Sequence, residues 1–262
     1  MLELILVVIA ALVGIVSAMI GLGGGFLIVP LLVLLFNVEI HQAVGTSLTM
    51  MVFTAASATF AYARQKRIDY KVGLILTIGT VPGAVLGAYL TTLVSGKLLT
   101  GLLAAFLLLV ATLMMRKEYK NTKSKVRWQR MIVDSQGVSF NYSARLVPGI
   151  ILSIFGGVVS GFFGIGVGTV MVPVMVLIVG IPIHITVAVS MFIMFFTSIS
   201  GALTHLALGD IMPEYALYLS VGIIFGTQVG AAAARKMKSR PLQMIFAIFL
   251  VVVAVRMILG LL

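Results

Sequence analysis

Two glycine-rich stretches, 143 residues apart (Gly21 and Gly164), are the part of this chain best suited to chemistry. The first runs over 17–30 and the second over 160–173, and a serine, three glycines, a valine and a proline recur in register between them. Each stretch interrupts an apolar run long enough to enter a membrane. Paired glycine breaks at matching places in two halves are typical of the binding site of a secondary transporter.

A glycine break in a membrane helix favours an anionic ligand. Glycine tolerates positive φ and lets other groups reach bare backbone. A helix that restarts after the break presents unpaired N–H groups and the positive end of its dipole. In the membrane interior each unpaired N–H group costs several kcal/mol, and an anion can supply the missing partner. The alternative, that these glycines only let helices pack closely, stays open.

Hydroxyl side chains on the second apolar segment of each half complete the candidate site. Ser47 and Thr54 recur at the same offset as Ser190 and Thr197. Hydroxyls donate to the oxygens of an anion without burying a charge, although bonding to the helix's own backbone is their commoner role in membranes. The predicted substrate-binding residues are Gly21, Gly23, Gly24, Gly25, Ser47, Thr54, Gly164, Gly166, Gly168, Ser190, Thr197 and the mid-segment Gln228.

Two histidines, His41 and His184, also lie 143 residues apart and begin apolar segments. They are candidates for coupling anion movement to protons near neutral pH, with a structural hydrogen bond as the alternative role. No acidic or basic residue lies deep in the apolar segments, which argues against a cation substrate. With no cysteine, three histidines and no paired carboxylates, we expect no metal site, no cofactor and no enzymatic activity.

Composition places nearly all of the chain in a membrane. Of its 262 residues 61% are hydrophobic and 10% are charged, with a mean hydropathy of +1.22. Soluble domains carry about 25% charged residues. The net charge of +11 comes from basic residues in short loops between apolar segments, a pattern that orients a membrane protein and does not indicate nucleic acid.

The repeat continues without a gap beyond the glycines, which indicates a duplication. We expect four apolar segments in each half, and the first of each half is too long for one simple span. Its glycines are predicted to fold it into a hairpin of two helical arms. The expected segments are 3–36, 42–63, 72–94 and 98–115, and then 147–179, 185–208, 215–234 and 241–261.

Equivalent loops in the two halves carry opposite charge, which predicts that they lie on opposite membrane faces. Loop 64–71 holds four basic residues and one acid, whereas its repeat partner 207–214 holds two acids and no Lys or Arg. The predicted fold class is an all-α polytopic membrane protein with two inverted-topology repeats, each a glycine-broken helical hairpin followed by three transmembrane helices. Parallel halves are the alternative. The repeats are 1–115 and 147–262, with both termini outside.

The connector between the repeats, 116–146, holds eight basic residues and is expected to be cytoplasmic. Within it, apolar and polar residues alternate over 138–142 after a turn-like 134–137, a pattern typical of a small hairpin. A plain solvated linker is an equal alternative. Elsewhere, glycines four residues apart within 79–87 and within 222–230 predict faces for close helix contact.

The pattern G-x-G-G-G-x-x-x-V-P from Gly21 to Pro30, with a second copy G-x-G-x-G-x-x-x-V-P from Gly164 to Pro173, resembles the TauE/SafE family of sulfite and organosulfonate exporters. The resemblance covers essentially the whole chain, including the basic connector. It implies a polytopic plasma-membrane protein that exports or exchanges small sulfur- or carbon-containing anions. In the second copy Val167 replaces a glycine, so the two half-sites differ.

The predicted function is secondary transport of a small anion, with sulfite or an organosulfonate as the first candidate and export as the expected direction. Coupling to protons is left open. An anion channel and a non-transporting membrane subunit that binds a soluble partner are the alternatives. The expected partners are the anion and the lipid bilayer, with a homodimer left open and nucleic acid excluded. The expected location is the cell membrane, as a multi-pass protein.

Overall fold

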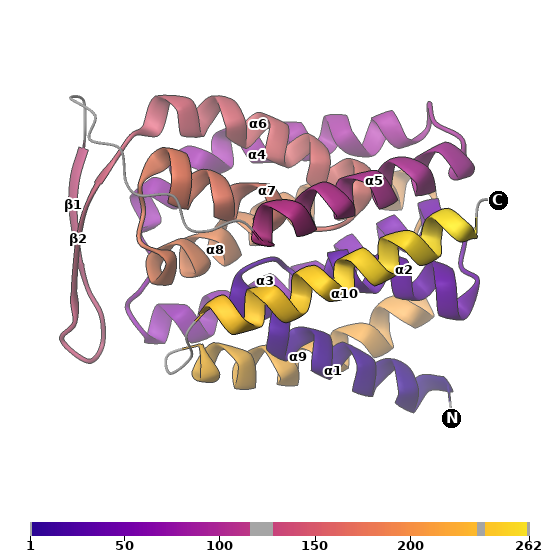
Figure 1. Ribbon diagram of the computed structural model, residues 1–262, viewed down its shortest axis with the longest axis horizontal. Helices are drawn as coiled ribbons and strands as arrows, with labels where there is room; N and C mark the ends of the chain where they lie inside the picture. Colours follow the sequence, from indigo (N-terminus) through magenta and orange to yellow (C-terminus); the bar gives the residue numbers. More distant parts are fainter. Residues whose placement is uncertain (1, 116–127, 235–238, 261–262) are drawn as a thin grey trace.

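The computed structural model describes residues 2–115, 128–234 and 239–260, so the first part of the basic connector, 116–127, lies outside the described residues. Helices lie side by side in a bundle, both chain termini lie at one end, and a two-stranded hairpin stands at the other (Figure 1). These two ends are called the terminal end and the hairpin end below.

The helices follow the predicted segments to within a few residues. The first half contains α1 (Leu2–Ile20), α2 (Gly25–Phe36), α3 (Ile40–Arg64), α4 (Tyr70–Thr91) and α5 (Gly96–Met115). The second contains α6 (Leu146–Phe163), α7 (Gly168–Pro173), its π-helical continuation η1 (Val174–Val179), α8 (Ile183–Leu208), α9 (Pro213–Ala233) and α10 (Ser239–Leu259). Both long first segments are broken at their glycines, as predicted.

The chain is a multi-pass membrane protein. Among the described residues, seven helices are long and apolar enough to cross a membrane: α1, α3, α4, α5, α6, α8 and α9. Large apolar side chains such as Ile78, Leu93 and Phe225 are exposed on the outside of the bundle. So much exposed apolar surface is unusual for a soluble monomer and ordinary for a surface in contact with lipid.

The two halves exchange their helix contacts. Helix α1 packs along α9, and its repeat equivalent α6 packs along α4, while α3 packs against α8 and α5 against α10. The glycines four residues apart make the α4–α6 and α1–α9 contacts, as predicted. Gly83 lies against the carbonyl of Ile154 and Gly226 against that of Ala11, where a Cβ would collide. Two similar halves related by a two-fold axis give such an exchange. The inverted orientation of the halves across the membrane stays a prediction.

The predicted hairpin of the connector is present and is the one exception to the all-α class in the described residues. Strands β1 (Trp128–Val133) and β2 (Ser139–Ala144) pair antiparallel, with Trp128 opposite Ala144. The Asp134 carboxylate stabilises the turn by accepting from the N–H groups of Gln136 at 2.8 Å and Val138 at 3.0 Å.

Ion pairs attach this hairpin to the loop between α3 and α4. Arg130 donates twice to Asp69, at 2.8 Å each, and Tyr142 donates to the same carboxylate at 2.6 Å. Asp69 also caps α4 by accepting from the N–H of Val72. Burial by itself raises the pKa of Asp69, but these hydrogen bonds outweigh it and hold the pKa below the ordinary 3.8. The ionised carboxylate is therefore part of the attachment.

The attachment predicts an acid-sensitive tryptophan signal. Trp128 is the chain's single tryptophan, and its ring lies 4.5 Å from the guanidinium carbon of Arg130. Because the pKa of Asp69 is lower in the folded protein than in the unfolded chain, its contribution is complete above pH 3.8 and is lost as the pH falls below that value. We expect Asp69→Asn to change Trp128 emission at pH 7, as acid does in the unaltered protein.

The control is Glu214→Gln, which removes an acid in the first turn of α9, away from the hairpin. Fluorescence of the purified protein in detergent, titrated from pH 7 to pH 2, measures both variants. Emission of Asp69→Asn that matches the unaltered protein throughout would contradict the attachment.

Candidate functional site

The two glycine breaks form the candidate site. Between α1 and α2, the backbone at Gly21, Gly23 and Gly24 has φ of 84°, 92° and 86°, and between α6 and α7, Gly164 and Gly166 have φ of 65° and 86°. Residues with a Cβ are strained in this left-handed region, which explains why glycine occupies these positions. All residues of both breaks are buried.

The breaks lie against each other inside the bundle. Gly25, the first residue of α2, packs against the carbonyl of Gly164, and Gly168, the first of α7, packs against the carbonyl of Gly21. At both positions a Cβ would collide with that carbonyl oxygen. The contact is reciprocal, so both halves of the chain build one centre.

Two serines hold the breaks in place, and both were predicted as site residues. Ser47 on α3 donates to the carbonyl of Gly164 at 2.6 Å, and Ser190 on α8 donates to the carbonyl of Gly21 at 2.8 Å. Both side chains are fully buried. Each serine therefore ties its own half of the chain to the break of the other half.

Two methionines that sequence reasoning missed lie beside the breaks. Met51 on α3 and Met194 on α8 are fully buried and again 143 residues apart. A Cβ at Gly23 would lie 3.2 Å from the sulfur of Met51 and would collide with Met194, and one at Gly166 would lie 3.0 Å from the sulfur of Met51. The two thioether side chains therefore close the space at the breaks. Their repeat spacing was the available signal.

The breaks leave buried donors unused. Within the described residues the main-chain N–H groups of 22–24 and 165–167 make no hydrogen bond, although every one of these residues is buried. The hydroxyl of Ser17, in the last turn of α1, is also buried without a hydrogen-bond partner there. It lies 3.5 Å from the position of a Cβ on Gly24. Unused donors suit an anion, because no carboxylate of the chain already occupies them.

The two predicted threonines follow Met51 and Met194 by three residues on α3 and α8 and already have partners. Thr54 donates to the carbonyl of Met50 in its own helix at 3.3 Å. Thr197 donates to the carbonyl of Ile193 at 2.9 Å and lies 2.8 Å from the hydroxyl of Thr80, at the contact of α8 with α4. Their hydrogen bonds fit the alternative backbone role, and their part in substrate binding stays a prediction.

The structure places Gln228 away from the breaks. Its amide donates to the carbonyl and the hydroxyl of Ser57 on α3, at 2.9 and 2.8 Å. It lines a pocket of about 640 Å³ between α3, α9 and the hairpin turn. The pocket residues are Ala61, Arg64, Gln65, Gln136, Gln228, Ala232 and Ala233.

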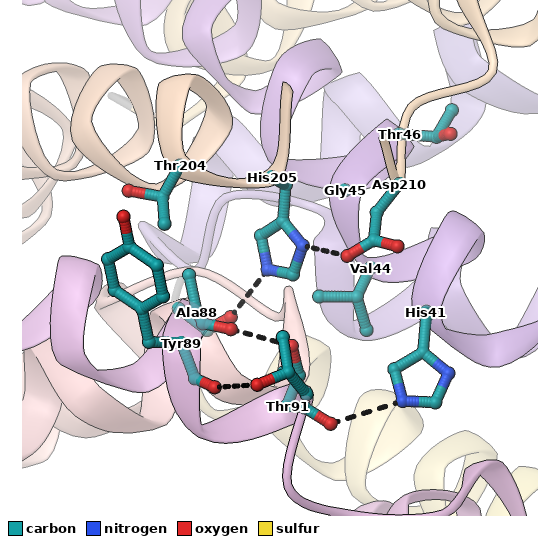
Figure 2. Close-up of polar contacts among 12 residues, drawn as sticks. His41, Val44, Gly45, Thr46, Ala88, Tyr89, Thr91, Thr204, His205 and Asp210 are labelled. Carbon is teal, nitrogen blue, oxygen red and sulfur yellow. Dashed lines mark hydrogen bonds and ion pairs between the residues drawn. The ribbon is translucent and has the colours of Figure 1, made fainter. Parts of the chain in front are cut away.

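The two predicted proton-coupling histidines have different surroundings. The Nε2 of His41 lies 3.2 Å from the carbonyl of Thr91 (Figure 2). It also lies 3.1 Å from the carbonyl of Val94, and the Nδ1 of the ring faces Glu39. The ring of His184 lies 6.2 Å from the ring of Phe140 in the hairpin. Proton coupling by either histidine stays a prediction.

Comparison with known proteins agrees with this architecture. The family model described as "Sulfite exporter TauE/SafE" matches residues 6–257. The chain belongs to the TauE/SafE family. It is 38% identical to the probable membrane transporter protein YunE of Bacillus subtilis over 97% of this chain and 96% of that protein. It is 25% identical to a probable membrane transporter protein of Methanocaldococcus jannaschii, over 97% and 95% of the two chains. No solved structure matches.

Family membership makes this TauE/SafE chain a membrane transporter and not an enzyme. Among the described residues, no group of three or more His, Cys, Asp or Glu side chains is placed to hold a metal ion.

The crossing serines predict an unequal response to two similar substitutions. Ser47→Ala leaves the buried carbonyl of Gly164 without its donor, whereas Ser198→Ala removes a buried hydroxyl that bonds only to its own helix, at Phe195. Loss of a partner to a buried acceptor costs about 1–3 kcal/mol. We expect Ser47→Ala to lower the thermal midpoint in detergent clearly more than Ser198→Ala. Equal midpoints would mean that the serine does not hold the break.

Proposed function

We propose that this protein is a secondary transporter of a small anion, with sulfite or an organosulfonate as substrate, in the plasma membrane. The observation that carries the proposal is the meeting of two glycine breaks in which the buried N–H groups of 22–24 and 165–167 have no hydrogen-bond partner within the described residues. In this proposal the halves are inverted, residues 116–146 are cytoplasmic and the direction is export.

The donors at the breaks match the chemistry of a sulfur oxyanion. Sulfite and sulfonate groups present three oxygen acceptors on one sulfur, and the breaks offer main-chain N–H groups from both halves. The hydroxyl of Ser17 adds a side-chain donor. Binding an anion there would satisfy groups that otherwise cost several kcal/mol each in a membrane interior. The seven predicted glycines and the two crossing serines fit this role by shaping and holding the breaks.

The packing favours a carrier over an open channel. The two breaks touch, and the side chains of Met51 and Met194 lie against their glycines. A channel needs a continuous pore, whereas a carrier needs a closed centre that opens to one side at a time. Rocking of one half against the other would open it, since each break is held by a serine from the opposite half.

The direct test is exchange of radiolabelled sulfite in proteoliposomes, with unlabelled sulfate, sulfoacetate and acetate as competitors. We expect saturable exchange that proceeds against a gradient, and competition by one chemical class of anion. Flux without counterflow would favour a channel. No flux with any of these anions would contradict the proposed function.

Ser17 separates a substrate contact from a structural role. Its hydroxyl is buried and has no partner in the described residues, so Ser17→Ala removes no hydrogen bond and should leave the thermal midpoint unchanged or higher. If the hydroxyl donates to the anion, the KM for exchange rises about tenfold or more, because a hydrogen bond to a charged group contributes about 1.5–3 kcal/mol. Ser220→Ala, which removes another buried and unpartnered hydroxyl on α9, is the matched control.

Substitution of the glycines completes the experiment. Gly23→Val and Gly166→Val each place a branched side chain at a positive φ against Met51, so both should abolish exchange. An unchanged KM in Ser17→Ala, together with exchange in both valine variants, would place the substrate elsewhere in the bundle.

A further inference from the structure

A third histidine, His205 in the last turn of α8, is fully buried and has an oxygen acceptor at each ring nitrogen. Its Nε2 lies 3.1 Å from the carbonyl of Gly161. Its Nδ1 lies 3.0 Å from the carboxylate of Asp210 (Figure 2). Gly161 is in the last turn of α6, three residues before the second glycine break. The ring therefore connects a carboxylate directly to the helix end that leads into the break.

This geometry requires a proton beyond those of a neutral imidazole and a carboxylate. Nε2 needs a hydrogen because a carbonyl oxygen only accepts. A neutral ring has one hydrogen, so Nδ1 would then present a lone pair to an ionised Asp210. The other neutral tautomer would present the lone pair of Nε2 to Gly161. Both contacts are favourable only when a second proton is shared between Nδ1 and the carboxylate oxygen.

The repeat shows what this proton-dependent bond replaces. Tyr62 is the repeat equivalent of His205, and its hydroxyl donates to the carbonyl of Ala18, the equivalent of Gly161, at 2.6 Å. Both halves therefore tie the end of their broken helix to a side chain. In the first half the donor is a phenol, which keeps its hydrogen at neutral pH. In the second half it is an imidazole, a group that can gain or lose a proton near neutral pH.

The surroundings give the pair a fixed position and a route for the proton. The side chain of His205 has no exposed surface, while that of Asp210 is 20% exposed. The loop that carries Asp210 is held on α3, where Gly45 packs against the Asp210 carbonyl and Thr46 accepts from the N–H of Met212. A proton can thus pass between water and the buried ring through the carboxylate.

We propose that the His205–Asp210 pair binds the proton that this transporter couples to movement of its second glycine break. The proton lost from the pair leaves through Asp210 to water. The remaining lone pair then repels either the carboxylate or the Gly161 carbonyl, and the hold on α6 is released. This coupling rests on the proposed function, since it needs an anion carrier to act on.

The neighbouring titratable groups do not take this role in the same way. His41 on α3 has its own carboxylate, Glu39. Its ring bonds to Thr91 at the end of α4 and to Val94 just after it, and not to a broken helix. Tyr89 on α4, also drawn in Figure 2, is exposed. Asp210 is therefore the charged group that contacts His205 directly.

The test uses Asp210→Asn, which can keep a hydrogen bond to Nδ1 but cannot share a proton with it. Proteoliposomes are loaded with a pH-sensitive dye, and the probe is sulfoacetate, whose charge does not change between pH 6 and pH 8. For one coupled proton, a gradient of one pH unit shifts sulfoacetate accumulation by up to about tenfold. We expect this shift and the dye signal in the unaltered protein, and the loss of both in Asp210→Asn and His205→Gln. Glu39→Gln is the comparison variant.

Each outcome decides a separate point. No exchange by the unaltered protein at equal pH contradicts the proposed function, and exchange without proton movement contradicts the coupling alone. A proton signal lost in Glu39→Gln and kept in Asp210→Asn would assign the coupling to His41 and overturn our proposal. The thermal midpoint in detergent tests the pair without transport: between pH 6 and pH 8 it should fall with rising pH in the unaltered protein and respond less in Asp210→Asn. Equal pH responses would also overturn the proposal.

Discussion

The structure depends on how a broken helix is satisfied inside a membrane, where each main-chain polar group needs a partner. Four carbonyls at the broken ends receive one from the central helices. Ser47 and Tyr62 on α3, and Ser190 and His205 on α8, donate to Gly164, Ala18, Gly21 and Gly161. The N–H groups of 22–24 and 165–167 receive none from the described residues. In our proposal these unused donors suit the centre to an anion.

The same constraint explains why small residues dominate the contacts outside the centre. Helices without a hydrophobic driving force between them associate by close van der Waals packing. Glycines such as Gly83 and Gly226 bring α4 onto α6 and α9 onto α1 until backbone meets backbone. These contacts join one half to the other: the first helix of each half, α1 or α6, packs along a helix of the opposite half, α9 or α4. Movement of one half against the other therefore displaces the breaks, because the two helices that flank each break pack on different halves.

The repeat offset made much of this accessible from sequence. It located both breaks, the helical segments, the contact faces and the crossing pair Ser47 and Ser190, since duplicated residues keep equivalent positions. Gln228 was predicted from its mid-segment position and not from the offset, and the structure bonds it to Ser57 beside a pocket. His205 was missed for the opposite reason. Its repeat equivalent is Tyr62, so a search for identical pairs discards it, and its contact with Gly161 joins two helices 44 residues apart in the chain.

The two breaks are alike in backbone geometry, but the helices that continue from them differ. The first break continues into α2, a regular helix of 12 residues, and is tied by a phenol. The second continues into six residues of α7 and then into the π-helical η1, whose wider turns are rare and often occur at functional sites. The end of η1 is bonded to the hairpin side, where the N–H of Arg145 donates to the carbonyl of Val179. The second broken segment is thus bonded to the His205 side chain before its break, at Gly161, and to the connector after it, at Val179. Two differences between the duplicated halves therefore lie on this one segment, as our proposal of a carrier with one proton-responsive half-site requires.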